Sequence, residues 1–448
     1  MKAEIFAISN RTAWRSTWIL VFAALLCSVD RTLPGVLTDP IRNGMGFSDT
    51  QMSLLVGMAF AISYGLSSFP MSWLADRYSR PRIITGGIVF WCLATLACGL
   101  APDFSTLFVL RMGVGLGEAA LVPAGLALLA DLFTRERLPR AVAVISAGSA
   151  LGIALAFPVA TGLHELFETL ARDHGWLAGI DAWRPTFVAV GLAGLLLALF
   201  TARLPEPRRG RAGRLQTADA DAEGLFAYLR RSAAFTAPML AGVMLFNFYL
   251  NGYLAWLAPY FTRTHGWTLA KTGQVLGVAV VGAGIVGSLC SGWLATALSH
   301  RRGRDSAMWV TALTVLLTLP LALLAPLMAD AGWSLALTAA QLFFTFATWT
   351  VMTTALINAA PPHLRARFVA INMFAGGLLG VGLGPTIYAL LTDRVFQDPA
   401  KLNLSLALGS ALLLLPTLLV LARAAMRYHA ALAQLLPPRA AGGAGSGP

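Results

Sequence analysis

Four ionisable residues lie inside long apolar stretches of the sequence, and they are the first candidates for chemistry. They are Asp30, Arg31, Arg111 and Glu118. A charge at the centre of a bilayer costs at least ~3 kcal/mol on insertion scales, so such residues must face a cavity or one another. Intramembrane charges are functional by default. We therefore expect Asp30 and Glu118 to couple protons, and Arg31 and Arg111 to bind an anionic substrate or to neutralise these acids. The alternative is a structural set of ion pairs that locks two helices together.

The depth of these residues follows from the helical rise of about 1.5 Å per residue. Asp30 lies about 20 Å from the face where its span begins, and Arg111 about 9 Å from the opposite face. In a core about 30 Å thick the two are at one level. Glu118 lies about 10 Å deeper on the same side of its helix. We expect a two-level ladder, with Asp30, Arg31 and Arg111 above and Glu118 below. Substrate capture of an Arg would favour proton uptake by the freed acid.

The composition explains what positions these residues. The chain has 448 residues, of which 57% are hydrophobic and 12% charged. Soluble domains are about 25% charged, so a soluble enzyme, a disordered chain and the usual nucleic-acid binder are excluded. The net charge of +12 comes from short Arg clusters between apolar runs. No metal-ligand spacing, P-loop or nucleophile elbow is present. We therefore expect no enzyme activity, no metal or other cofactor and no nucleic-acid partner.

The apolar runs are continuous and long enough to cross a bilayer as helices, which needs roughly 20 residues each. The pattern predicts an all-α membrane protein with twelve transmembrane helices. Basic residues number 24 in the loops on the side of the N-terminus and 7 on the other side. The positive-inside rule then predicts that both termini are cytoplasmic and that the protein is a multi-pass protein of the cell (inner) membrane. The twelve predicted spans are 16–38, 50–74, 83–100, 105–133, 140–165, 184–203, 236–260, 269–298, 307–328, 334–360, 367–392 and 403–427.

A long polar loop divides the chain. We expect an N-terminal six-helix bundle over 1–203, a cytoplasmic linker over 204–235, a C-terminal six-helix bundle over 236–436 and a disordered tail over 437–448. Two loops of the first half recur in the second: 72–82 matches 292–302, and 131–143 matches 358–370. Matching loops at equivalent places indicate two pseudo-symmetric bundles.

Three polar residues of the seventh span are uncommon at lipid-facing positions, and we expect them to line a cavity and bind substrate. They are Asn247, Asn251 and Tyr253. Helix kinks are expected at Pro158 and at the Gly384-Pro385 pair, because proline removes a helical hydrogen bond.

The loop after the second span carries the acid Asp76 among Arg77, Arg80 and Arg82. Positive-inside topology explains the three Arg residues, but an acid there works against that pattern. We interpret this cluster as a cytoplasmic gate.

These motifs resemble a known superfamily. SWLADRYSRPR at 72–82 is similar to the signature loop of the major facilitator superfamily, with Ser72 in place of the usual Gly. Arg111-x-x-x-Gly115-x-Gly117-Glu118 resembles the Arg-and-Gly motif of its fourth helix. The resemblance implies the major facilitator fold of two six-helix bundles. It also implies that Asp76 pairs with the helix that begins near Arg367 when the inner side is closed.

Within the superfamily the chain resembles the spinster-like family. Four stretches carry the resemblance: VDR at 29–31 followed by GVLTDPI, GVGLGEAA at 113–120, ADLF at 130–133 and LLGVGLGPTIYALLTD at 378–393. This resemblance implies a proton-coupled secondary active transporter, working by alternating access, for an amphipathic anion such as a lysophospholipid or sphingoid phosphate.

The alternatives within transport are a proton symporter for small organic anions of the sugar-acid type and a drug or metabolite exporter. A non-transporting receptor on the same fold is a rival from another class, although it would gain nothing evident from buried acids. The expected partners are protons, membrane lipid and a small-molecule or lipid substrate, and the expected state is a monomer.

Overall fold

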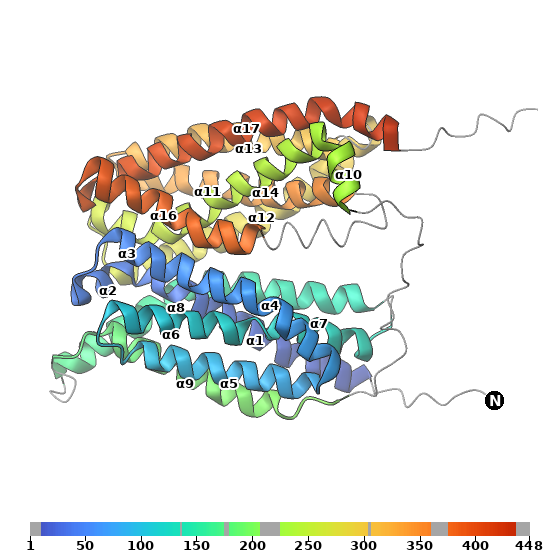
Figure 1. Cartoon of the computed structure of the whole chain (residues 1–448). Coiled ribbons are helices and arrows are strands. Elements are labelled where there is room, and N and C mark those ends of the chain that lie inside the picture. Colours follow the sequence, from blue (N-terminus) through green and yellow to red (C-terminus); the bar gives the residue numbers. More distant parts are fainter. Residues whose placement is uncertain are drawn as a thin grey trace, which may run out of the picture.

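The computed structural model describes residues 10–134, 137–173, 179–206, 225–302, 306–359 and 375–435, and every regular element among these residues is a helix. Figure 1 shows two stacked layers of helices, with the first half of the chain in one and the second half in the other. The first layer contains α1 (Asn10–Val36), α2 (Thr38–Met45), α3 (Asp49–Ser53), η1 (Leu54–Met58), α4 (Ala59–Arg77), α5 (Arg80–Cys98), α6 (Phe104–Glu118), α7 (Leu121–Leu132), α8 (Leu138–Asp173) and α9 (Trp183–Thr201).

The second layer begins with a short helix, α10, which lies within the predicted linker. It contains α10 (Leu225–Arg231), α11 (Ala233–His265), α12 (Leu269–Arg302), α13 (Ser306–Leu324), η5 (Ala325–Leu327), α14 (Ala331–Ala359), η6 (Ala375–Val381), α16 (Gly382–Leu390), η7 (Leu391–Phe396), η8 (Pro399–Lys401) and α17 (Leu402–Leu435).

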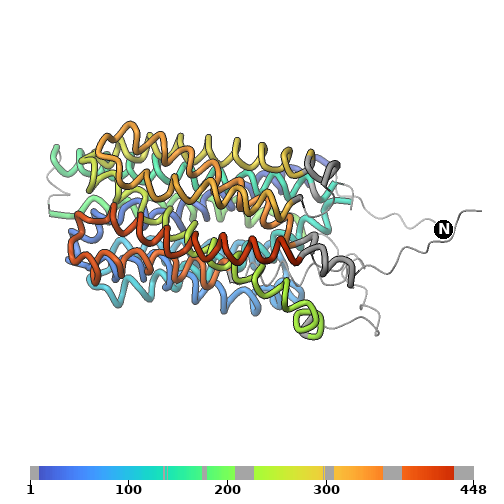
Figure 2. Tube along the Cα trace, turned by 90° about the horizontal axis from the view of Figure 1, so that it is seen from above, coloured from blue at the N-terminus to red at the C-terminus, as the bar shows by residue number. Residues whose placement is uncertain are grey.

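The long helices run side by side along one direction, as Figures 1 and 2 both show. The start of α1 and the end of α17 lie at the same end of the bundle, which we call the terminal end. The opposite end, which we call the distal end, holds α2 and the loop between α11 and α12. A chain that crosses the membrane an even number of times has its first and last helices end on the same side, so this arrangement agrees with the predicted twelve crossings.

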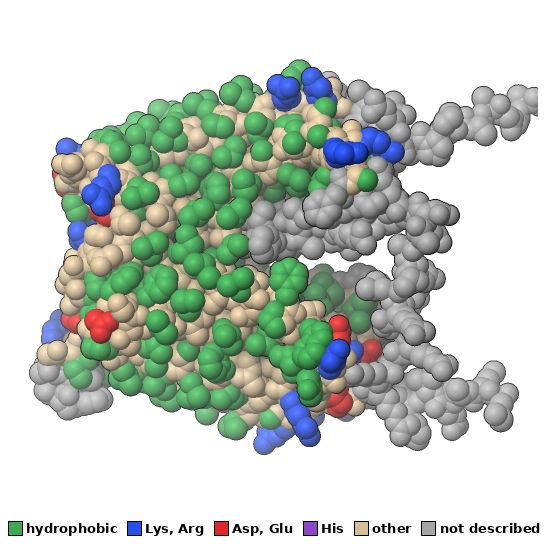
Figure 3. All heavy atoms as spheres, in the orientation of Figure 1, with side chains coloured by type: hydrophobic (Ala, Val, Ile, Leu, Met, Phe, Trp, Pro, Cys, Tyr) green, Lys and Arg blue, Asp and Glu red, His purple; other side chains and the backbone are tan. Residues whose placement is uncertain are grey.

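Eleven helical stretches among the described residues are long and apolar enough to cross a membrane. The eleventh predicted span, 367–392, begins in residues outside the described part, and its described portion forms η6, α16 and the first two residues of η7. Side chains on the flank of the molecule are mostly hydrophobic, whereas Lys and Arg gather near its two ends (Figure 3). Large apolar residues such as Phe69 and Trp293 are more than 70% exposed. This distribution suits a lipid environment, because lipid solvates apolar side chains.

The fourth predicted span is one membrane crossing built from two helices. Asp103 caps the first, α6, by accepting a hydrogen bond from the amide of Thr106 at 2.9 Å. α6 ends at Glu118, and α7 begins after a two-residue turn at Ala119 and Ala120. The break therefore directly follows the acid that the sequence identifies as a candidate for proton coupling.

Two of the predicted kink positions differ in their surroundings. Pro158 lies inside the uninterrupted α-helix α8. Gly384 and Pro385 lie in α16, which is flanked on both sides by the π-helical segments η6 and η7. Wider turns at such places are a known cause of helix bending. The kinks themselves stay a prediction.

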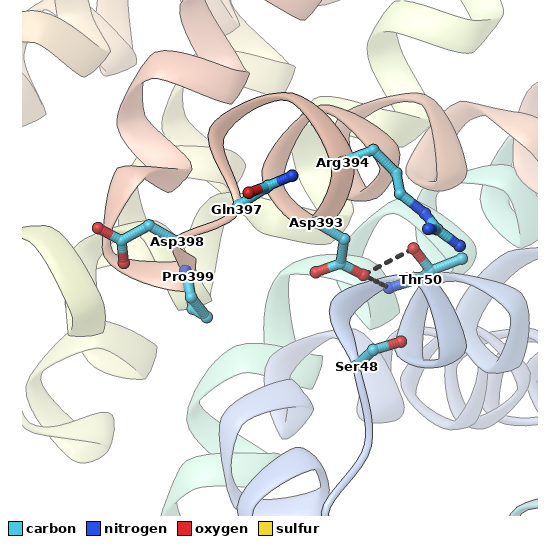
Figure 4. A pocket seen from close by; sticks show the side chains of 7 residues that line it. All are labelled: Ser48, Thr50, Asp393, Arg394, Gln397, Asp398 and Pro399. Atoms are coloured by element: carbon cyan, nitrogen blue, oxygen red, sulfur yellow. Dashed lines mark hydrogen bonds between the residues drawn. The ribbon is translucent and has the colours of Figure 1, made fainter.

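The two halves are joined at the distal end by hydrogen bonds and ion pairs. Arg263 of α11 contacts both Asp39 and Asp49 of the first half, each with a shortest distance of 2.7 Å. Figure 4 shows a second link, in which the amide and hydroxyl of Thr50 donate to one oxygen of Asp393 at 2.7 and 2.6 Å. The distal end is thus closed between the halves.

Backbones of the two halves also approach closely near this end. A Cβ atom at Gly57 of η1 would lie only 2.5 Å from the carbonyl oxygen of Val381 and 2.7 Å from that of Gly382. Real Cβ atoms do not come so near to backbone oxygens, so only glycine allows this contact. The sequence of η1 therefore permits a tight seal between the second and eleventh spans.

Candidate functional site

The first buried ion pair joins Asp30 of α1 to Arg111 of α6. Nη1 of Arg111 lies 3.3 Å from Oδ1 of Asp30, and both residues are only 1% exposed. The hydroxyl of Thr95, on α5, donates to the other oxygen of Asp30. Nε and Nη2 of Arg111 have no hydrogen-bond partner among the described residues. This pair links three helices and is sealed from its surroundings.

The second ion pair joins Arg31 of α1 to Glu118 of α6. Nη2 and Nε of Arg31 lie 2.8 and 3.3 Å from Oε2 of Glu118, and the thiol of Cys27 lies 3.1 Å from the same oxygen. Glu118 is fully buried, whereas the side chain of Arg31 is 37% exposed. The Arg31 guanidinium lies over the rings of Phe60 and Tyr64, with 4.5 and 5.1 Å to their centroids. This pair has one accessible partner and one inaccessible partner.

The predicted ladder was wrong in one respect, since Arg31 belongs with Glu118 and not with Asp30 and Arg111. Successive residues of an α-helix point about 100° apart, because one turn takes about 3.6 residues. Asp30 and Arg31 therefore face different neighbours despite being adjacent in sequence. The structure has two separate cross-links between α1 and α6, each with one acid and one Arg.

One oxygen of Glu118 stands out in this site. Oε1 is buried and has no hydrogen-bond partner within the described part of the chain, while Oε2 takes all the contacts from Arg31 and Cys27. A buried polar atom without a partner is costly and calls for a functional or structural reason. Within the described ranges, the carboxyl of Glu118 thus depends on Arg31 as its one cationic partner.

The three polar residues predicted in the seventh span lie on α11 and are largely internal. The amide of Asn247 donates to the carbonyl of Val243 at 2.9 Å, and that of Asn251 to the carbonyl of Asn247 at 2.9 Å. Asn247 and Tyr253 are buried, and Asn251 is half-buried. A Cβ at Gly376 would lie 3.0 Å from Oδ1 of Asn247, so this side chain packs against η6. Their role toward a substrate stays a prediction.

The cluster predicted as a gate lies at the terminal end of α4 and α5. Asp76 is exposed and makes no hydrogen bond or ion pair with another described residue. Its expected partner near Arg367 lies outside the described residues. Arg77 stacks over the ring of Trp73 at 4.1 Å, and Arg82 is exposed. Arg80 forms an ion pair with Asp131 at the end of α7.

No group of three His, Cys, Asp or Glu side chains in the described ranges is arranged to hold a metal ion. The site contains the carboxyl groups of Asp30 and Glu118 and the guanidinium groups of Arg31 and Arg111. A carboxyl can take up or release a proton, and an Arg can bind a phosphate or carboxylate through two parallel hydrogen bonds.

Comparison with known families decides which class of protein carries this site. The model of the Major Facilitator Superfamily matches residues 20–385. The chain belongs to the Major Facilitator Superfamily. This superfamily protein is therefore a multi-pass membrane transporter and not an enzyme.

The relatives of this superfamily member have names that refer to different transport activities. It is 28% identical to an MFS-type efflux pump of Mycolicibacterium smegmatis, over 90% of this chain and 89% of that protein. It is 26% identical to the sphingosine-1-phosphate transporter SPNS2 of Danio rerio, over 92% of this chain and 82% of that protein. It is also 26% identical to a probable L-galactonate transporter of Escherichia coli, over 62% of this chain and 60% of that protein.

Among solved structures, a bacterial homolog of the human lysosomal transporter spinster aligns with a TM-score of 0.78 and 23% identity. The alignment covers 96% of this chain and all of that chain, whose conformation is described as inward-facing and unoccupied. The likeness confirms the predicted major facilitator fold.

Several residues of this transporter were not recognised from the sequence. Asp131 is an acid beside a basic cluster, so the reasoning applied to Asp76 would have found it. Arg263 is one of few basic residues on its side of the membrane, which is a weak signal. Its partners Asp39 and Asp49 lie more than 200 positions away in the chain, so no local pattern could pair them.

Proposed function

We propose that this chain is a proton-coupled secondary transporter that moves an amphipathic anion by alternating access. The observation that supports it best is the Arg31–Glu118 pair, in which an Arg side chain that is 37% exposed holds a fully buried carboxylate. An anionic head group that reaches Arg31 competes with Glu118 for the same hydrogen-bond donors.

Competition at Arg31 would couple substrate to proton. Once a phosphate or carboxylate occupies the guanidinium, Glu118 loses the one cationic partner that it has in the described part of the chain and keeps there only the weak contact with the Cys27 thiol. A buried carboxylate without a counter-charge is strongly disfavoured, so the group would take up one proton. Release of substrate would restore the ion pair and expel the proton. Asp30 and Arg111 form the second proposed element, in which protonation of Asp30 would free Arg111.

An amphipathic substrate is favoured by the surroundings of Arg31. The rings of Phe60 and Tyr64 stack on one another, with centroids 5.3 Å apart, and lie beneath the guanidinium. Phe60 is buried and Tyr64 is partly exposed, so a ligand that binds Arg31 would meet the ring of Tyr64, which suits an apolar tail. The similarity to SPNS2 agrees with this substrate class, whereas the similarity to the L-galactonate transporter favours a sugar acid.

The proposal includes an orientation. The terminal end would face the cytoplasm of the cell (inner) membrane, because the sequence places most basic residues in the loops on that side. The closed distal end would then make the described state inward-facing, and the loop around Asp76 would close in the opposite state. The protein would act as a monomer.

The test is the pH dependence of binding by purified protein. Lysophosphatidate, its uncharged monoacylglycerol analogue and galactonate are the probes. If binding takes up one proton, the affinity for lysophosphatidate should rise as the pH falls, by up to tenfold per pH unit. Glu118→Gln should bind without this dependence and fail in uphill transport in proteoliposomes, while exchange across the membrane persists. The exposed control Glu165→Gln should behave as the wild type.

Arg31→Ala should weaken binding of lysophosphatidate more than that of the uncharged analogue, and Arg31→Lys should be a poor replacement, since it cannot form paired hydrogen bonds. Equal losses for both ligands would indicate structural damage. A preference of the wild type for galactonate would move the assignment to sugar acids. Normal pH-driven transport by Glu118→Gln would refute the coupling mechanism.

A further inference from the structure

We propose that a groove between α1 and α9, on the lipid-facing flank at the terminal end, binds one anionic phospholipid of the adjacent leaflet. The groove has a volume of about 960 Å³ and is lined by side chains of these two helices. This volume is at the upper end of the range of about 300–1,000 Å³ that is usual for ligand pockets. The proposal does not rest on the transported substrate or on the coupling mechanism.

The charge at the groove identifies the head group. Arg11, Arg15 and Arg203 line it, and no Asp or Glu does. All three are exposed, and their side chains form no hydrogen bond or ion pair with the described residues. In contrast, Arg31 and Arg263 are each held by an acid. Three unpaired guanidinium groups at a membrane surface are the kind of basic pocket that binds anionic lipid head groups.

The wall of the groove is apolar and suits an acyl chain. Trp18 and Phe22 of α1 and Phe200 of α9 are 53%, 57% and 54% exposed, and all three line it. The apolar lining on α1 runs from Trp14 to Leu26, which are twelve positions or about 18 Å apart along the helix. One leaflet accounts for half of a hydrocarbon core about 30 Å thick. The apolar wall is therefore comparable in length to one leaflet, which would put the basic residues near the membrane surface.

The position of the groove separates this lipid from the proposed substrate. α1 presents Cys27 and Arg31 to Glu118 of α6, whereas the groove lies where α1 meets α9. A lipid held there would fill the groove between these two helices. Glu118→Gln should consequently leave lipid binding unchanged, which distinguishes a failure of this proposal from a failure of the coupling mechanism.

Native mass spectrometry of the purified full-length protein tests the proposal, with phosphatidylglycerol and phosphatidylcholine of identical acyl chains as the probes. The wild type should retain phosphatidylglycerol preferentially. Each Arg→Gln change at positions 11, 15 and 203 should lower the affinity for phosphatidylglycerol about fivefold, equivalent to about 1 kcal/mol per basic residue. The matched control is Arg423→Gln/Arg427→Gln, two exposed basic residues near the same end on α17.

A second variant tests the shape of the groove without changing its charge. Ala193 of α9 is exposed and lines the groove, so Ala193→Trp should fill it and reduce retention of both lipids. Equal retention of the two lipids by the wild type would overturn the proposal, as would an equal loss in the α17 control. Dimers that dissociate with Ala193→Trp, in the absence of lipid, would instead show that a second copy of the chain occupies the groove.

Discussion

Replacing Arg263 should open the distal end of the transporter. Arg263 of α11 makes three hydrogen bonds of 2.7 to 2.9 Å to Asp39 and Asp49, which belong to the other half, and its Nη2 also lies 2.7 Å from Oδ1 of Asp39. Its side chain is 10% exposed, and those of Asp39 and Asp49 are 18% and 0% exposed. These bonds can exist only while the two halves meet at this end. Arg263→Gln therefore removes stabilisation from one conformation only.

The magnitude follows from burial. Breaking a buried ion pair by removing one partner typically costs about 3–5 kcal/mol. Two features place Arg263→Gln at the lower end of this range. Asp49 retains Arg42, whose Nε lies 3.1 Å away, and Asp39 is partly exposed to solvent. A loss of about 3 kcal/mol changes the ratio of closed to open distal ends by roughly two orders of magnitude.

Distances between spin labels on the distal loops measure this shift. Leu100 of the first half and Leu327 of the second are 69% and 46% exposed, so both can be labelled after replacement by Cys in a background without the four native Cys. The wild type should give one short distance, and Arg263→Gln an additional longer one.

Arg184→Gln is the matched control, because Arg184 binds the carbonyl of Ala101 at 2.7 Å within its own half. An unchanged distance distribution in Arg263→Gln would refute the reasoning. So would an equal change in the Arg184 control.

Three further predictions concern the interface, the buried pair and the gate. Gly57→Ala should also give the additional longer distance between the spin labels on the distal loops, because its Cβ would meet backbone oxygens of the other half. A Cβ at Gly86 would meet nothing within 4 Å, so the control Gly86→Ala should have no effect. Arg111→Leu should destabilise the protein by about 3–5 kcal/mol, seen as a lower melting temperature, and adding Asp30→Asn should recover most of it, because the unpaired buried charge is then gone. Asp76→Asn should favour the state that is open at the terminal end by about 1 kcal/mol, without direct loss of substrate binding. The measurement is the reactivity of an engineered cysteine that lies between the two halves and faces the terminal end, and this reactivity should increase.

The sequence by itself determined the class of the protein. Long apolar runs and a low content of charge leave only a helical membrane protein, since lipid cannot satisfy exposed backbone groups. The candidate acids and Arg residues could be found for the same reason, because burial of Asp30 and Glu118 in an apolar stretch is too costly to lack a partner. Helix positions followed from the runs themselves, as α9 at Trp183–Thr201 against the predicted 184–203 illustrates.

Only the tertiary structure decided which charges meet. Arg31 pairs with Glu118 because the helical turn of α1 points its side chain in a different direction from that of Asp30. The depth of a residue in the membrane, which is what the sequence predicts, does not specify the direction of its side chain. The distal network likewise joins Arg263 to acids more than 200 positions away, through packing of two halves that no local pattern encodes. The groove between α1 and α9 arises from the same cause. Sequence periodicity determines what each helix can bury, whereas the relative rotation and spacing of packed helices determine which side chains touch.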